Sequence, residues 1–102
     1  MRTIEQATDH LLDQIFNDLR RELAAAIAKH PPMHSAHEGH SVIREELDEL
    51  WDHVKADTGQ TVEARKEALQ VAAMGIRYAF DLCSRHDAEG LYRGLVEGHG
   101  VS

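Results

Sequence analysis

The sequence predicts an all-α fold: an antiparallel helical bundle of three long helices and a short C-terminal helix, completed by association with further copies of the chain. Apolar residues recur at spacings of three and four along three stretches, which is the period of an amphipathic helix. Residues that cap or stop helices separate these stretches. No stretch alternates apolar and polar residues as a strand does. With 102 residues, the chain is expected to form a single domain over 1–102.

The first predicted helix covers residues 3–29. Proline lacks the N–H that a further helical turn needs, so Pro31 and Pro32 end it. Its apolar stripe consists of Ile4, Ala7, Leu11, Ile15, Leu19, Leu23, Ala26 and Ile27.

The second predicted helix begins at Ser35 or Ser41 and ends at Asp57-Thr58-Gly59. Ser35 with Glu38 three residues later has the capping-box pattern, and Ser41 is a second possible N-cap. Gly59 can adopt the left-handed conformation that often follows a helix. The buried face of this helix is expected to centre on Ile43, Leu47, Leu50 and Val54.

The third predicted helix runs from Thr61 to about Ser84, and a short fourth helix is expected over 87–97. From Ala68 to Cys83 the third helix is apolar nearly all round, which is typical of a helix buried between neighbours. A three-helix monomer of this size cannot readily cover so much apolar surface. We therefore expect a homodimer or homotetramer.

Composition excludes several classes of function. A net charge of −7 argues against a nucleic-acid-binding surface. No apolar run approaches the roughly 20 residues of a membrane span, so no membrane partner is expected. The start MRTIEQATDH has no signal-peptide pattern, and the single Cys83 suits a reducing compartment, so we expect a cytoplasmic protein. Residues 31–60 hold seven acids and two bases, which indicates either a solvated acidic face or a bound cation.

Paired carboxylates occur on the second predicted helix. Glu46 and Glu49 are three residues apart, so their side chains stand over one turn, and they border the expected buried face together with His53. Like charges placed so closely repel each other unless a cation lies between them. This pair is either a solvated acidic face or part of a metal site.

A polar line interrupts the third predicted helix. Gln70, Arg77 and Asp81 share one narrow sector, which Glu63 and Glu67 extend towards the N-terminus of that helix. An Arg77–Asp81 pair would account for two of these residues and leave the others unexplained. Facing Glu46 and Glu49, the pair Glu67 and Gln70 would complete a set of oxygen ligands that suits Mg²⁺ or Mn²⁺. Since Mg²⁺ typically binds its substrate through phosphates, a nucleoside triphosphate is the expected substrate.

These residues resemble a known family. The run Glu45-Glu46-Leu47-Asp48-Glu49, a gap of seventeen residues and then Glu67-Ala-Leu-Gln70 is similar to the EExxE and ExxD motif of the MazG-like all-α nucleoside triphosphate pyrophosphohydrolases. The resemblance covers residues 34–83 and is greatest to the short phage and actinobacterial branch. It implies cleavage between the α and β phosphates, which gives a (deoxy)nucleoside monophosphate and pyrophosphate. It also implies dimers or tetramers with active sites near subunit contacts.

Carried over position by position, the resemblance makes Glu46, Glu49 and Glu67 metal ligands and Glu45 the leading acid with a supporting catalytic role. Gln70 stands where the motif has Asp. A glutamine carbonyl can coordinate a hard cation, but it adds no charge and cannot act as a base, so the number of metal ions stays open. The family's downstream lysine and asparagine have no clear counterpart in RHDAEGLYRGLVEGHG.

Three further residues are candidates for substrate binding. Arg77 can grip two phosphate oxygens at once. His34 and His37 lie near the start of the acidic helix, where they contact either a phosphate, a base or other parts of the protein. With His30 and His40 they could also form a Zn²⁺ or Ni²⁺ site, for which the sequence fixes no fourth ligand.

Two other classes of function remain open. One is a helical metal-binding or metal-storage bundle rich in His and Glu, although no Glu has the His three residues later that a di-iron site uses. The other is a noncatalytic, degenerate homologue, which Gln70 keeps open. Release of pyrophosphate from a triphosphate in the presence of Mg²⁺ separates these alternatives from the enzyme.

Overall fold

A computed structural model describes residues 3–84 of the chain, and all regular structure within them is helical. The helices are α1 (Ile4–Lys29), α2 (Ala36–Ala56) and α3 (Val62–Tyr78), and a five-residue π-helix, η1 (Ala79–Cys83), continues α3. The all-α prediction is therefore confirmed for the described residues, with the three long helices at the predicted places. The short helix expected over 87–97 lies outside the described residues.

Each long helix begins at a hydroxyl side chain that caps it. Thr3 forms a full capping box with Gln6 at the start of α1, and Thr61 accepts the amide hydrogen of Ala64 at the start of α3. Of the two serines considered for α2, Ser35 is the N-cap, and its Oγ accepts from the Glu38 amide at 3.1 Å. The Glu38 carboxylate in turn accepts a hydrogen bond from the amide of His34. Hydrogen bonds therefore run in both directions between the residues before α2 and its first turn.

The turn between α2 and α3 depends on Gly59. This residue has φ +69°, the left-handed conformation predicted for it, and lies two residues beyond the C-cap Asp57. The Asp57 carboxylate accepts from the Gly59 amide at 2.7 Å, and a Cβ at Gly59 would lie 2.9 Å from Val54. Glycine is therefore required here both for backbone conformation and for space.

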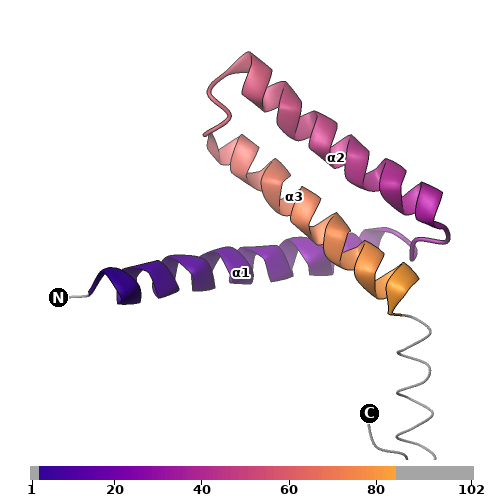
Figure 1. The fold of residues 1–102 in the computed structure, drawn as a ribbon, viewed down its shortest axis with the longest axis horizontal. Helices are drawn as coiled ribbons and strands as arrows, with labels where there is room; N and C mark the ends of the chain where they lie inside the picture. The colour runs from indigo at the N-terminus through magenta and orange to yellow at the C-terminus, as the bar shows by residue number, and fades with distance from the viewer. Residues whose placement is uncertain (1–2, 85–102) are drawn as a thin grey trace, which may run out of the picture.

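Helices α2 and α3 lie side by side and antiparallel, and α1 crosses α3 (Figure 1). Three polar contacts fix how α1 and α3 align: Asp18 with Arg65, Glu22 with Gln70, and the carbonyls of His30 and Pro31 with Arg77. In these contacts, residues further along α1 meet residues further along α3. The two helices therefore run in the same general direction. The N-terminal part of α1 extends away from the α2–α3 pair (Figure 1).

Close contact between α2 and the end of α3 depends on Gly39, which is buried. A Cβ at this position would lie 2.6 Å from the ring of Tyr78 and 2.9 Å from the side chain of Leu82. The absence of a side chain thus lets α2 approach α3 and η1 through this face.

This contact places the buried face of α2 differently from the sequence prediction. Ile43 and Leu50 are partly buried, but Leu47 and Val54 are 51% and 42% exposed. The expected centre of the buried face is therefore wrong for this chain on its own, because α2 packs against α3 through the side that carries Gly39. The buried apolar residues are few and small: Ala26, Met33, Ala64, Leu69, Ala73 and Met74.

The inward-facing side of α3 includes the polar line as well as buried apolar residues. Arg77 is 5% exposed, whereas Ile76 and Phe80 are 41% and 64% exposed. The Arg77 Nη2 donates to the carbonyls of Pro31 at 2.6 Å and His30 at 3.3 Å, and lies 3.7 Å from Asp81. The Asp81 carboxylate also accepts from the Met33 amide at 2.9 Å. This buried pair fastens the α1–α2 linker to the end of α3, and we call it the linker clasp.

No helix within residues 3–84 is both long enough and apolar enough to cross a membrane.

Candidate metal centre

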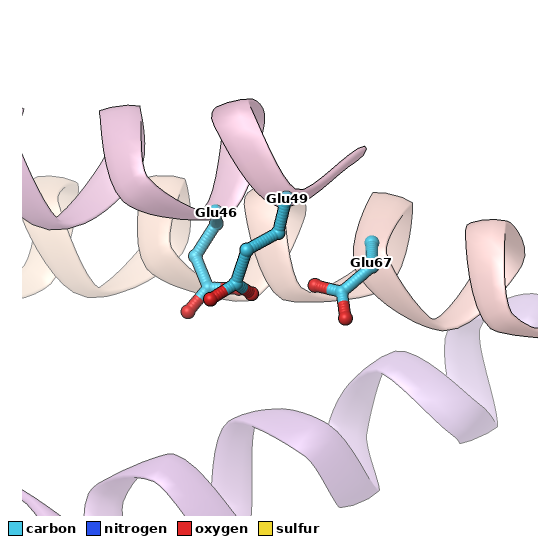
Figure 2. A group of neighbouring side chains, drawn as sticks. All are labelled: Glu46, Glu49 and Glu67. Carbon is cyan, nitrogen blue, oxygen red and sulfur yellow. The ribbon is translucent and has the colours of Figure 1, made fainter. Parts of the chain in front are cut away.

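Three glutamates from two helices converge in the structure. Glu46 and Glu49 lie one turn apart on α2, Glu67 lies on α3, and each supplies a carboxylate oxygen within 4.8 Å of the others. Their side chains extend towards the side on which α1 passes (Figure 2). The antiparallel pairing of α2 and α3 brings the two stretches together, and we call these three residues the carboxylate cluster.

Part of the carboxylate cluster is hidden from solvent. Glu46 and Glu67 are partly buried, and Glu49 is exposed. The Oε2 atom of Glu67 is inaccessible to solvent and has no hydrogen-bond partner among the described residues. A buried carboxylate oxygen without a partner costs free energy, so a proton or a cation at this position would stabilise the protein.

The carboxylates also resist simultaneous ionisation. Burial, followed by the negative charge of Glu49, raises the pKa of Glu46 to about 7. Burial and Glu49 likewise raise the pKa of Glu67, and the neighbouring His53 opposes this change. A group of carboxylates that repel one another in this way loses its protons readily when a cation binds between them.

The donor set fits a hard divalent cation. All three donors are carboxylate oxygens, with no thiolate among them, and they come from two helices that hold them on one side. Mg²⁺ is usually bound through a few carboxylates and keeps several waters, whereas zinc sites favour sulfur and nitrogen donors. Glu46, Glu49 and Glu67 would therefore hold Mg²⁺ or Mn²⁺ and leave positions open for a ligand.

A cavity of about 430 Å³ adjoins the carboxylate cluster at Glu46. Three helices form its walls: the C-terminal half of α1, the first part of α2 and the inward sector of α3. Its volume lies in the range of small-molecule sites. The charged side chains that line it are Glu22, Lys29, Glu38, Glu45, Glu46, Lys66 and Arg77.

The structure brings some of the predicted site residues together and leaves others apart. Glu45, Gln70 and Arg77 line the cavity together with Glu46. His34 and His37 are exposed and are not among the residues that line it, whereas His30 is. Within the linker clasp, Arg77 binds backbone carbonyls and Asp81 through Nη2, so part of its guanidinium already serves the fold.

Glu22 on α1 is a site residue that the sequence analysis missed. Its carboxylate accepts a hydrogen bond from the side-chain amide of Gln70, and both residues line the cavity and are partly buried. A signal for it existed, because Glu22 lies three residues after Leu19 and four before Ala26, on the apolar stripe of α1. Its contact with Gln70 depends on how α1 crosses α3.

Comparisons of this chain with models of known protein families, with curated proteins and with solved structures found no match. The resemblance to MazG-like enzymes therefore depends on the motif residues alone.

Proposed function

We propose that this protein binds Mg²⁺, or Mn²⁺ in its place, through Glu46, Glu49 and Glu67 and hydrolyses nucleoside triphosphates to nucleoside monophosphates and pyrophosphate. The observation that carries the proposal is the convergence of these three carboxylates, with an unpartnered buried oxygen on Glu67, beside a cavity of about 430 Å³. The spacing of the motif residues supports the same reaction. Glu45, which lines the cavity, is the proposed supporting acid.

In the proposed mechanism the chain's own residues bind the substrate, and one of them accepts a proton. Glu46, Glu49 and Glu67 would hold Mg²⁺, which would supply positive charge to the phosphate oxygens and make water more acidic. Water attacks the α-phosphorus, the bond to the β-phosphate oxygen breaks and pyrophosphate leaves. Glu45 accepts the proton that the attacking water loses. The guanidinium of Arg77, at the cavity wall, orients the phosphates.

The test is release of pyrophosphate from a panel of (deoxy)nucleoside triphosphates with Mg²⁺. We expect Glu46→Gln, Glu49→Gln and Glu67→Gln each to reduce turnover by about a hundredfold or more, because each removes a charge from the cation site at constant size. Asp48→Asn is the matched control, since Asp48 is exposed on α2 and lies outside both the cluster and the cavity lining. Parental turnover by the Glu46 and Glu67 variants would contradict the proposal.

A chain that binds Mg²⁺ through the cluster and hydrolyses no triphosphate would instead be a noncatalytic metal-binding bundle. The contact between Gln70 and Glu22 favours this alternative, because it engages the side chain that stands in place of the motif's Asp. Calorimetry of metal binding together with the pyrophosphate assay separates the two functions.

We also propose that the working form is a homodimer or homotetramer. Large apolar side chains on the part of α1 that extends from the α2–α3 pair are exposed: Ile4, Leu11, Leu12, Ile15 and Phe16. Burial of such a stripe against a second copy would supply the partner that this part of α1 does not find within the described residues.

A further inference from the structure

The cavity beside the carboxylate cluster has a cationic side as well as an acidic one. Lys29 on α1, Lys66 on α3 and Arg77 on α3 all line it. Arg77 is engaged in the linker clasp. Neither lysine makes an ion pair within residues 3–84, although several glutamates line the same cavity. Neither lysine is therefore engaged in a close ion pair with these carboxylates.

Lys29 and Lys66 differ from the other described cations in combining a place in the cavity lining with the absence of an ion pair. Arg21, Lys55 and Arg65 each lie within 3.5 Å of an aspartate oxygen on the surface. Arg20 and Arg44 make no ion pair among the described residues either, but they do not line the cavity. A lysine that lines a cavity beside a cation site and makes no ion pair is suited to bind an anionic ligand there.

We propose that Lys29 and Lys66 bind the phosphate groups of a polyphosphate in this cavity; its identification as the triphosphate of the substrate rests on the proposed function. Lys66 precedes Glu67 in sequence and lies one turn before Gln70, so it approaches from the end of the cavity where the carboxylate cluster lies. Lys29 precedes His30, whose carbonyl contacts Arg77, so it approaches from the linker end. From the level of Lys66 to that of Arg77, α3 rises by about 16 Å.

This spacing favours an extended polyanion over a single small anion. Flexible lysine stems that start from different helices, at different levels of the cavity, can converge on neighbouring phosphate groups. One carboxylate or one phosphate would place a single charge between two ammonium groups and the cation. A polyphosphate supplies a charge to each of them and oxygens to the cation.

The experiment measures binding of inorganic tripolyphosphate by calorimetry at saturating Mg²⁺, with Lys29→Met, Lys66→Met and the double variant. Methionine keeps the apolar stem and removes the charge. We expect each single change to weaken binding about tenfold and the double change about a hundredfold, as loss of a charge-assisted hydrogen bond does. Arg20→Met and Arg44→Met are the matched controls, for which we expect changes below about twofold because these residues lie outside the cavity.

The outcomes distinguish this proposal from the proposed function. Wild-type affinity for tripolyphosphate in the double lysine variant, or no binding by the wild type, would overturn the lysine site. Neither outcome would contradict the proposed Mg²⁺ binding and turnover. Loss of tripolyphosphate binding in the double variant, together with unchanged Mg²⁺ affinity in Glu46→Gln and Glu67→Gln, would support the lysine site and remove the proposed metal centre. Circular dichroism checks that each variant keeps the helical content of the wild type.

Discussion

Glu46 makes the carboxylate cluster sensitive to pH. Its pKa is raised from 4.5 to about 7, so between these values the folded chain holds a proton that the unfolded chain has released. Without metal, stability should therefore fall as the pH rises from about 4.5 through about 7. Thermal unfolding with a chelator at pH 5 and pH 8 measures this, and Glu46→Gln should reduce the difference. Equal melting temperatures of the wild type at the two pH values would contradict the raised pKa.

The same protonation should oppose metal binding. Mg²⁺ must displace the proton from Glu46, so its affinity should rise as the pH rises through about 7 and level off above that value. Calorimetry in buffers of different ionisation enthalpy measures the number of protons released. Release of no proton near pH 6 would show that Glu46 does not bind the cation.

Gln70 offers a second test at the level of one residue. Gln70→Asp adds a charge to the proposed site and should tighten Mg²⁺ binding. Because Gln70 donates to Glu22, the same change places two carboxylates against each other and should lower the melting temperature of the metal-free protein. Adding Glu22→Gln should restore that stability. Unchanged or weaker Mg²⁺ affinity in Gln70→Asp would show that residue 70 does not contact the cation.

Residue spacing predicted which acids come together but could not predict which side chains are buried. Glu46, Glu49 and Glu67 follow from helical period and an antiparallel turn, both of which are local. The burial of Arg77 and the contact of Glu22 with Gln70 depend on where α1 crosses α3. That crossing is set by tertiary packing, for which the sequence gives no direct signal.

At the level of elements, the packing of α2 on α3 depends on Gly39. Gly39→Ala should destabilise the fold by about 1–3 kcal/mol, since the added Cβ would meet Tyr78 at 2.6 Å and Leu82 at 2.9 Å. Gly75→Ala is the matched control, because nothing lies within 4 Å of a Cβ there and alanine favours the helix by about 0.5–1 kcal/mol. Urea denaturation measures both, and equal effects of the two substitutions would contradict this account of the packing.

The linker clasp should stabilise the protein more than any exposed ion pair. Asp81→Ala removes the partner of a buried guanidinium and leaves the Met33 amide unpaired, so we expect a loss of about 3 kcal/mol or more. Asp52→Ala breaks the exposed pair with Lys55 and should cost less than about 1 kcal/mol. Similar free energies of unfolding for the two variants would show that the clasp is not stabilising.

Helix boundaries were the most predictable part of the elements. Ser35, Thr61 and Gly59 mark them through short-range hydrogen bonding and backbone conformation, which the sequence specifies directly. The buried face of α2 was not predictable from periodicity. Leu47 and Val54 lie on its apolar stripe but remain exposed, because the close approach at Gly39 selects a neighbouring face.

At the level of the whole molecule, the described residues form an extended arrangement. Their radius of gyration is 17.3 Å, whereas a compact domain of 100 residues has about 13 Å. With the exposed apolar stripe of α1, this leads us to expect a dimer or tetramer by light scattering at micromolar concentration. Leu11→Glu with Phe16→Glu should shift the mass towards the monomer, and Asn17→Glu, on the opposite side of α1, should not. A monodisperse wild-type monomer would contradict the expectation.

The three-helix construction of the cavity has a consequence for motion. Helix α1 forms one wall, and Asp18, Glu22 and the linker clasp tie it to α3. A ligand that fills the cavity contacts α1 and the α2–α3 pair at once. Its binding free energy therefore adds to the free energy needed to separate α1 from that pair. At a ligand concentration a hundred times the Kd, that addition is about 2.7 kcal/mol. Amide hydrogens in the C-terminal half of α1 exchange when that half unfolds, which would also release the occupant, so an occupied cavity should slow their exchange about a hundredfold.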